Sequence, residues 1–499
     1  MLRVQGRLDS DNADRWLPWL FALLIALAFG LMYGARVRSL DGGSGLAPWL
    51  QAAWRRGHGG AGVPMTGTDP ARGTWSIVSE AVLQVTRVVP AESVFVVVQA
   101  IALGLAVVPL WRLARREARL RVGASTVIVI AFALAPVMNR AAMGAFHPEL
   151  LAVPALIAAY DRSCRGQWVR FGLLLVFAVL CRADLGITVA ALDALLVVEG
   201  KRFPGGAAIL CGLAWSATAN VAIGRDVPHE ALTPAGEFLA RSALPLAVAP
   251  DVFRHPWDTL LDLAAEPSVI FLMVVLAPLL FLPLVAPRRA VLAAPCLVLA
   301  MVADRAVQRT AGQGVLDLSP AAAHIGPAMA FVFVALVYAL ARIGHQSVTR
   351  VNVDHRVLFA LLAGVLLLFA TESPVSPYEH PWSWGGRDAL DGARMQSADL
   401  VGHDAAVATS PQVSALLAAR AVIVEMPPHP RSFDKKRIER IADEVQAIVL
   451  DTSETVDDEG QPVWTSTRRA LVVDEFEQHG FTVVSDIQNV LVLVRDDGA

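Results

Sequence analysis

The chain has 499 residues, of which 55% are hydrophobic and only 17% are charged, and its formal net charge is -3. Water-soluble proteins keep about 25% of their residues charged, so this composition excludes a soluble enzyme, a disordered tail protein and a fibrous repeat. The near-neutral charge gives no broad basic surface, and we expect no nucleic acid partner. The four cysteines all lie in or beside apolar stretches, which excludes a disulfide framework or a zinc site in the polar C-terminal region.

Apolar stretches dominate residues 17–371. A helix needs about 20 apolar residues to cross the hydrocarbon core of a bilayer, and eleven stretches of about this length or somewhat shorter follow one another. The sequence therefore predicts an α-helical polytopic membrane protein with about eleven transmembrane helices. The stretches are 17–35, 92–111, 122–138, 148–160, 169–181, 184–199, 205–223, 267–286, 290–304, 323–341 and 356–371.

Basic residues in the short connections predict the orientation in the membrane. The connections after the second, fourth, sixth, eighth and tenth stretches are basic, and alternating spans place all five on one side. Short basic loops stay in the cytoplasm. We therefore expect a retained, cytoplasmic N-terminal segment 1–16, an extracytoplasmic C-terminus, outer loops at 36–91 and 224–266, and location in a plasma membrane. The basic residues are Arg112, Arg115, Arg116, Arg119, Arg121, Arg162, Arg165, Arg170, Lys201, Arg202, Arg288, Arg289, Arg342, Arg350 and Arg356.

The composition changes after residue 371. Segment 372–396 contains several prolines and tryptophans and predicts a linker. Within residues 397–499, the stretches AAVAT, AVIVEM and AIVLD are typical of buried parallel strands, and FTVVSDIQNVLVLVRD predicts two strands joined by a tight turn. We therefore expect a small extracytoplasmic α/β domain. Its first strand leads into Ser410-Pro411 without a glycine-rich turn, so a nucleotide site is not expected.

Ionisable residues near membrane depth are costly and mark functional candidates. In FHPE, His147 and Glu149 flank a proline suited to the first position of a helix, whose amino end favours anions. In CRADLG, Arg182 and Asp184 lie between two apolar stretches on the same expected face. The alternatives are a solvated helix cap for the first pair and an internal ion pair for the second. Asp193 lies deeper and needs a partner.

Two runs of sequence carry a resemblance to a known family. FHPELLAVPALIAAYDR and LLLVFAVLCRADLGITVAALDALLVV, followed by DAAVATSPQVSALLAARAVIVEMPPHP, resemble the membrane family catalogued as domain of unknown function 2079. The resemblance covers about residues 30–430. That family looks like a distant relative of the C-type (GT-C) glycosyltransferases, which take a sugar from a polyprenyl-phosphate carrier at the outer face and commonly use an acid of the first outer loop as general base.

The chain departs from the pattern of this family at three polar positions. In GLAPWLQAAW, Gln51 and Trp54 fit the pattern, but Gly45 stands where the first aspartate is expected. The histidine of a later family motif is replaced in the segment 74–77, TWSI, and a glutamate is missing from Arg182-Ala183-Asp184. Either another acid takes over, Asp41 or Asp69, or the chain has lost catalysis.

The leading hypothesis is therefore a GT-C-like membrane glycosyltransferase that moves a sugar from a polyprenyl-phosphate donor to an acceptor of the cell envelope. Asp41 is the preferred general base. Arg182 and the helix start at residue 148 are expected to hold the leaving phosphate, and His147 and Glu149 to orient it or to bind a divalent cation. Two such ligands are too few to predict a metal site. Further expected substrate contacts are Asp184, Gln51, Trp54 and Asp69.

Two rival hypotheses come from other classes. A catalytically degenerate protein that binds the lipid carrier, or serves as a scaffold, follows from the missing acids. A transporter is the second rival. Transporters show internal repeats and polar residues at the bilayer midplane, whereas this sequence has no clear repeat and its polar groups gather at the ends of the apolar stretches.

Overall fold

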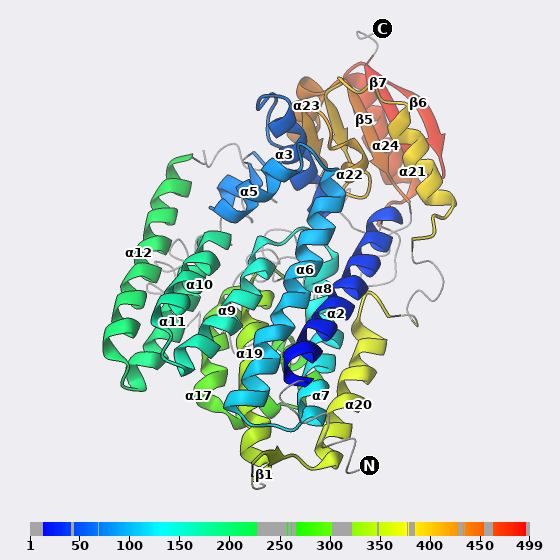
Figure 1. The fold of residues 1–499 in the computed structure, drawn as a ribbon. Coiled ribbons are helices and arrows are strands. Elements are labelled where there is room, and N and C mark those ends of the chain that lie inside the picture. Colours follow the sequence, from blue (N-terminus) through cyan, green and yellow to red (C-terminus); the bar gives the residue numbers. More distant parts are fainter. Residues whose placement is uncertain are drawn as a thin grey trace.

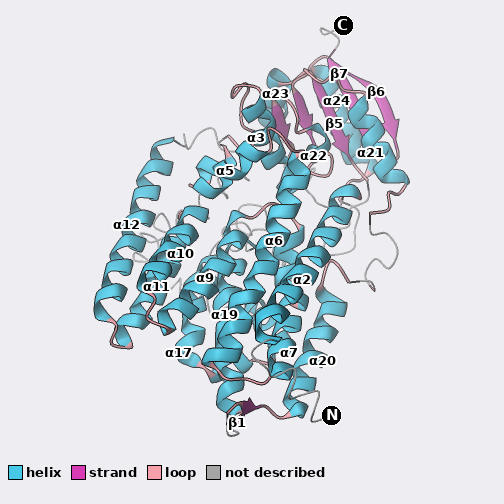
Figure 2. Cartoon of the chain, viewed as in Figure 1, coloured by secondary structure: helices cyan, strands magenta, loops and turns pink. Residues whose placement is uncertain are grey.

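A bundle of long helices carries a small α/β domain at one end in the computed structural model (Figure 1). The first helix that the structure describes begins at the opposite end of the bundle from this domain. Helix dominates the fold, and strands gather almost entirely in the C-terminal domain (Figure 2). The structure describes residues 13–40, 44–67, 69–226, 266–301, 322–346, 349–376, 385–427, 435–453 and 463–495, with the single positions 257, 261, 378 and 433.

The helices of the bundle cross it in alternating directions. Five helices are long and apolar enough to cross a membrane, or six if the bent pair α7–α8 counts as one span. The prediction of a helical membrane protein is confirmed, but the count of eleven spans is not. The bundle consists of α2 (Ala13–Arg38), α6 (Ala91–Arg112), α7 (Val122–Leu134), α8 (Pro136–Met143), α9 (Pro148–Cys164), α10 (Trp168–Cys181), α11 (Leu185–Val198), α12 (Arg202–Asp226), α16 (Glu266–Leu276), α19 (Ala322–Ile343) and α20 (His355–Glu372).

The shortest apolar helices explain much of this difference. α10 and α11 have 14 residues each, below the roughly 17–25 residues that span a bilayer. The turn between them carries two charged residues, which end the apolar pattern early. The turn of the hairpin α10–α11 therefore lies short of the ends of longer helices, such as α6, that are nearest the C-terminal domain (Figure 1).

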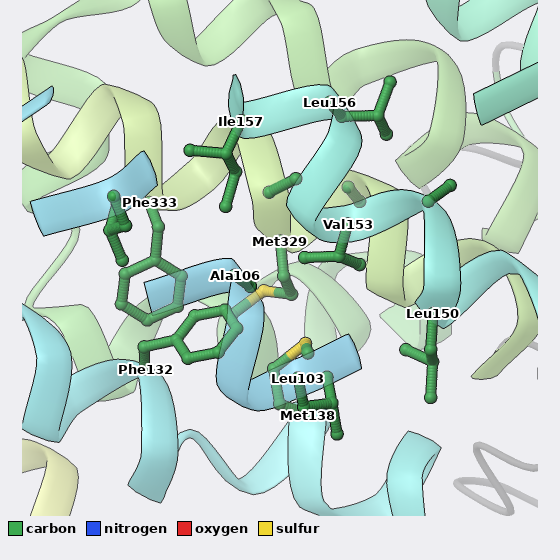
Figure 3. Close-up of a cluster of buried hydrophobic side chains, with 14 of the residues drawn as sticks. Leu103, Ala106, Phe132, Met138, Leu150, Val153, Leu156, Ile157, Met329 and Phe333 are labelled. Atoms are coloured by element: carbon green, nitrogen blue, oxygen red, sulfur yellow. The ribbon is translucent and has the colours of Figure 1, made fainter. Parts of the chain in front are cut away.

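The core of the bundle forms where four helices face one another. Leu103 and Ala106 from α6 pack with Leu150 and other side chains of α9, and Met329 and Phe333 of α19 close the cluster together with Phe132 of α7 (Figure 3). These side chains are fully buried or nearly so. Burying large aliphatic and aromatic groups stabilises the fold by about 1.5–3 kcal/mol for each side chain and fixes how α9 and α19 approach.

Glycines allow the closest helix crossings. A methyl group at Gly186 of α11 would overlap the backbone of Gly212 in α12, and the reverse also holds. Gly326 of α19 similarly faces Leu150 of α9, where a methyl group would lie 2.5 Å from the leucine side chain. Small residues let membrane helices pack backbone to backbone, so these positions set the spacing of the elements that carry the candidate site.

Contacts between the basic connections link them at the end of the bundle opposite the domain. We call this the basic end, and the other the domain end. The five basic connections were predicted to lie on one side, and these contacts agree with that prediction. The linking contacts are Arg165 to Glu117 at 3.3 Å, Lys201 to the Ser163 carbonyl at 3.0 Å, Arg289 to Glu199 at 3.3 Å, Arg342 to the Val285 carbonyl at 2.9 Å and Arg350 to the Arg115 carbonyl at 2.5 Å.

The C-terminal domain contains one five-stranded sheet in the order β4-β3-β5-β7-β6. β3 pairs in parallel with β4 and β5, whereas β7 is antiparallel to both β5 and β6. The three predicted parallel strands and the final pair of strands are therefore confirmed. The strands are β3 (Val407–Thr409), β4 (Ile423–Glu425), β5 (Ala447–Asp451), β6 (Phe481–Ile487) and β7 (Val490–Arg495), and the helices are α21 (Ala389–Asp399), α22 (Ser414–Leu417), α23 (Lys435–Glu444) and α24 (Ser466–Gln478).

Two features of the domain differ from the sequence-based expectation. Helix α21 begins inside the expected linker 372–396, and Ala393 packs into the core of the domain. The first loop also enters that core, through Ala47 and Met65. Its elements are η1 (Ser44–Leu46), α3 (Ala47–Gly57), α4 (Pro70–Gly73) and α5 (Ile77–Val85). The domain is thus completed by chain from the loop between the first two long helices.

Candidate functional site

The first part of the candidate site is the start of α9. Pro148 occupies the first turn of this helix, and His147 precedes it in an extended conformation. The imidazole Nδ1 of His147 lies 2.9 Å from Oε1 of Glu149. The Glu149 side chain is 2% exposed and that of His147 is 15% exposed. A buried carboxylate therefore orients an imidazole that reaches the surface.

The second part is the turn between α10 and α11. Nη1 of Arg182 lies 3.5 Å from Oε1 of Glu149, and its Nε lies 2.9 Å from Oδ1 of Asp184. All three side chains are almost completely buried. The two charged corners predicted from FHPE and CRADLG therefore meet, and one guanidinium joins two carboxylates.

A third part, which the sequence did not single out, is His324 on the first turn of α19. Its Nδ1 lies 2.9 Å from Oδ2 of Asp184, and the side chain is 1% exposed. An imidazole at the start of an apolar stretch was the only signal in the sequence. We call the five residues His147, Glu149, Arg182, Asp184 and His324 the polar cluster.

The charges of the polar cluster shape its chemistry. One arginine faces two carboxylates, so the cluster carries one excess negative charge when both histidines are neutral and none when one is protonated. Arg182 was expected either to clamp a phosphate or to pair internally. Its ion pairs with Glu149 and Asp184 favour the second alternative, because a phosphate at Arg182 has to displace a carboxylate.

Gln99 of α6 holds the segment before His147 in place. Its Nε2 donates to the carbonyl oxygens of Ala142, at 2.7 Å, and Ala145, at 3.2 Å, while its Oε1 accepts from the backbone N–H of His147 at 2.9 Å. The side chain is 1% exposed. An amide within an otherwise apolar helix was a signal that the sequence-based interpretation missed.

The first loop lies directly on the turn that carries Arg182 and Asp184. The backbone N–H of Ala183 donates to the carbonyl oxygen of Thr74 at 3.1 Å. From the other side, the hydroxyl of Ser216 on α12 donates to the carbonyl oxygen of Ala183 at 2.8 Å. Both backbone groups of Ala183 are thus satisfied, which fixes the turn between a loop and a helix.

Gly45 lies beside the segment that leads to His147. A methyl group at this position would lie 2.7 Å from Cβ of Ala145 and 3.1 Å from the carbonyl oxygen of Gly144. The structure therefore has no space for an aspartate where the family pattern expects one. Asp41, the preferred base, lies outside the described residues, as do most of loop 224–266 and most of segment 1–16.

Gln51 joins the first loop to the C-terminal domain. Its Nε2 donates to the carbonyl oxygen of Val63 at 2.9 Å and to that of Arg420 at 3.4 Å, and its Oε1 accepts from the N–H of Met65 at 2.6 Å. The N–H of Val63 also donates to the Ala421 carbonyl at 3.0 Å. Two of the hydrogen bonds of this buried amide hold the first loop together, and the third joins the loop to the domain at Arg420.

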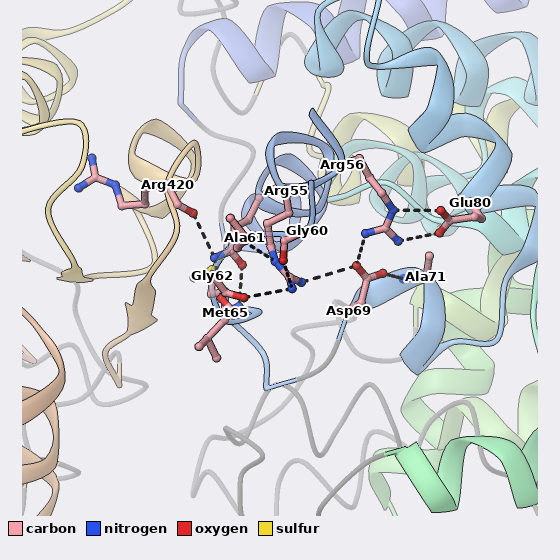
Figure 4. A network of polar contacts seen from close by, with 12 residues as sticks. Arg55, Arg56, Gly60, Ala61, Gly62, Met65, Asp69, Ala71, Glu80 and Arg420 are labelled. Carbon is pink, nitrogen blue, oxygen red and sulfur yellow. Dashed lines mark hydrogen bonds and ion pairs between the residues drawn. The ribbon is translucent and has the colours of Figure 1, made fainter. Parts of the chain in front are cut away.

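Asp69 belongs to an ion network within the first loop. It caps α4 and lies 2.6 Å from Arg56, which also forms a two-pronged contact with Glu80 (Figure 4). The hydrogen bonds from Arg56 lower the pKa of Glu80. Trp54 stacks on the ring of His58, with 4.1 Å between ring centroids. Both described acids of the first loop are therefore engaged by arginine.

Two further observations concern groups of metal-ligating side chains and a buried acid. Within the described ranges, no group of three or more His, Cys, Asp or Glu side chains is placed to hold a metal ion. Asp193 is fully buried on α11, and neither carboxylate oxygen has a hydrogen-bond partner among the residues that the structure describes. The partner expected for Asp193 is therefore not found in this part of the chain.

Comparison with known proteins identifies the family. A family model described as "Predicted membrane protein (DUF2079)" matches residues 82–493, which include the helices α6 to α20 and nearly all of the C-terminal domain. No curated protein matches the chain. The matched region covers most of the sequence and contains the whole polar cluster. The chain therefore belongs to the DUF2079 family of predicted membrane proteins.

Proposed function

We propose that this membrane protein is a glycosyltransferase of the GT-C type, which moves a sugar from a polyprenyl-phosphate donor to a hydroxyl group of a cell-envelope acceptor. The observation that carries the proposal is the pair of His147 and Glu149, an imidazole near the surface hydrogen-bonded to a buried carboxylate at 2.9 Å. Such a pair is suited to accept a proton, because the carboxylate fixes the tautomer of the ring and stabilises its charged form.

In the proposed reaction, the Nδ1–H group of His147 donates a hydrogen bond to Glu149 and keeps its proton, so that the unprotonated Nε2 is the proton acceptor. The acceptor hydroxyl loses its proton to Nε2 while its oxygen forms a bond to the anomeric carbon of the sugar. The bond from that carbon to the phosphate oxygen breaks, and the polyprenyl phosphate leaves with the electron pair. Arg182 contacts Glu149 and is itself held by Asp184, so these two residues keep Glu149 in place.

The orientation forms part of the proposal. The basic end faces the cytoplasm of a plasma membrane, with the N-terminus on that side, because short basic connections are retained there. The polar cluster, the first loop and the C-terminal domain then face outward. The first loop lies on the turn of Arg182 and Asp184, and the C-terminal domain packs on that loop, so the two are suited to shape an acceptor site.

The test is consumption of a lipid-linked sugar by the purified, full-length protein. We expect His147→Gln and Glu149→Gln to lower the rate by about 100-fold or more, as for loss of a general base. Asp41→Asn tests the base preferred from the sequence. Matched controls are His355→Gln and Glu372→Gln, whose side chains are 78% and 45% exposed at the ends of α20.

Each variant is compared with the wild type by thermal unfolding, so that loss of folding is distinguished from loss of chemistry. If His147→Gln folds normally and keeps full activity, His147 is not the base. If only Asp41→Asn abolishes transfer, the base is in the first loop and the polar cluster has a structural role.

A non-catalytic lipid-carrier protein is the second candidate, and one observation favours it. Asp69 and Glu80 are both engaged by Arg56, and Gly45 has no space for an acid. This alternative predicts thermal stabilisation by a polyprenyl phosphate without turnover. Turnover of any lipid-linked sugar would exclude it.

A further inference from the structure

Arginines outnumber acids where α6 and α9 end, at the basic end of the bundle. Arg112 closes α6, and Arg116 follows one turn later in the π-helical segment Leu113–Glu117. Arg162 lies in the last turn of α9. The charge of Arg112 lies within electrostatic range of Arg116, Arg162 and Arg165. Four positive groups therefore share one small region.

Both acids of this region form ion pairs with the same arginine. Arg165 forms ion pairs with Asp161, at 2.5 Å, and with Glu117, at 3.3 Å. Arg112, Arg116 and Arg162 form no ion pair with a carboxylate in the part of the chain that the structure describes. Arg162 does donate to the amide oxygen of Gln167 at 2.9 Å. Four arginines against two acids leave an excess of two positive charges.

Other partly or fully buried arginines at the same end have acidic partners. Arg115 and Arg350 share Asp14, at 2.7 Å and 3.6 Å, and Arg289 pairs with Glu199 at 3.3 Å. The helix dipole favours arginine at the C-terminal end of a helix, and this effect explains the presence of one arginine at such an end. It does not account for three close arginines without an acidic partner, of which two, Arg112 and Arg162, are partly buried.

The surroundings of Arg112 place this group at the surface of the membrane. Its guanidinium lies 6.0 Å from the centre of the Trp19 ring on α2. Trp16 and Trp19 are 53% and 51% exposed, although they belong to the start of an apolar span. Exposed tryptophans at the end of a membrane helix mark the level of the lipid headgroups, so the arginines lie where phosphates of lipids are found.

We propose that the phosphate of an anionic phospholipid headgroup binds between Arg112, Arg116 and Arg162. Guanidinium groups bind phosphate oxygens in pairs of parallel hydrogen bonds, and basic residues beside a membrane helix attract anionic lipids. The acyl chains lie along the exposed apolar face of α2 beside Trp19. A soluble phosphate would supply the same headgroup chemistry but would gain nothing from that apolar face.

The test is native mass spectrometry of the full-length protein with phosphatidylglycerol or with phosphatidylcholine. We expect the triple variant Arg112→Gln/Arg116→Gln/Arg162→Gln to bind phosphatidylglycerol at least about tenfold more weakly than the wild type. The control Arg202→Gln/Arg288→Gln/Arg356→Gln removes the same charge from exposed positions at the same end and should bind as the wild type does.

Equal weakening in the triple variant and the control would overturn the proposal, because the attraction would then come from net charge alone. Equal binding of the two lipids by the wild type would overturn it as well. A third arm adds inorganic phosphate, and displacement of the lipid at millimolar phosphate would overturn the assignment to a lipid. Thermal unfolding of both variants without lipid shows that each is folded.

Discussion

The two ends of the bundle accommodate charged side chains in opposite ways. At the domain end, Glu149, Arg182 and Asp184 are 2–3% exposed, and each charge has an opposite partner. At the basic end, Arg165 and Glu117 remain 19% and 27% exposed, and positive charge is in excess. Burying a charge is tolerable only when it is paired, whereas water and lipid headgroups satisfy the excess at an open end. The difference shows that burial, more than the number of charges, distinguishes a candidate site.

The largest expected effect comes from removing the central guanidinium at the domain end. Arg182→Met leaves Glu149 and Asp184 buried beside each other without a counter-charge, and breaking a buried pair costs about 3–5 kcal/mol. We expect a correspondingly lower unfolding free energy in denaturant titrations in detergent. The control Glu117→Gln at the basic end removes an acid that is 27% exposed and leaves Arg165 paired with Asp161, so it should cost about 1 kcal/mol or less. Similar losses of unfolding free energy in the two variants would contradict the difference between the two ends of the bundle.

A smaller effect is expected where the first loop joins the C-terminal domain. Gly62 has φ of +82°, and a methyl group there would overlap the carbonyl oxygen of Ala421. Gly62→Ala should therefore lower stability by about 2–3 kcal/mol. A methyl group at Gly57 meets nothing within 4 Å, so Gly57→Ala is the control. If the midpoint temperature of thermal unfolding is almost unchanged in both variants, the loop and the domain are not held together at this point.

The smallest effect concerns the partly exposed ion pair of Arg56 and Glu80 at the domain end. The pKa of Glu80 is lowered by its hydrogen bonds from Arg56, so this pair stabilises the protein above the ordinary pKa of glutamate. The contribution is lost as the pH falls through the lowered value. Because the Glu80 side chain is 41% exposed, the loss should be below about 1 kcal/mol. Stability profiles of the wild type and Glu80→Gln from neutral to acidic pH should converge at the acidic limit. A constant difference at all pH values would contradict this account.

The sequence allowed the two charged corners to be predicted because arginine, aspartate and glutamate are rare in apolar stretches. His147, Glu149, Arg182 and Asp184 could therefore be singled out. Their distances could not, because these depend on how α9, α10 and α11 pack. The strands of the C-terminal domain were predictable from short runs of buried β-branched residues, since local pattern determines them.

Other parts depended on contacts far apart in the chain. His324 and Gln99 are single polar residues in apolar helices, and only the packing of α19 and α6 against α9 gives them partners. Gln51 was expected to contact substrate, whereas its amide is used by a carbonyl oxygen 369 residues away. Family resemblance indicates which residues matter in relatives, but not which hydrogen bonds they form here.

The central claim is that the polar cluster is one site that opens to the surface through His147. Residue-resolved labelling of histidines with diethylpyrocarbonate tests it most directly, with the 78% exposed His355 as reference. We predict that His147 reacts more slowly than His355, that His324 is protected, and that a polyprenyl phosphate slows labelling of His147 several-fold without affecting His355. Equal labelling of His147 and His324, or no effect of the lipid on His147, would contradict the claim.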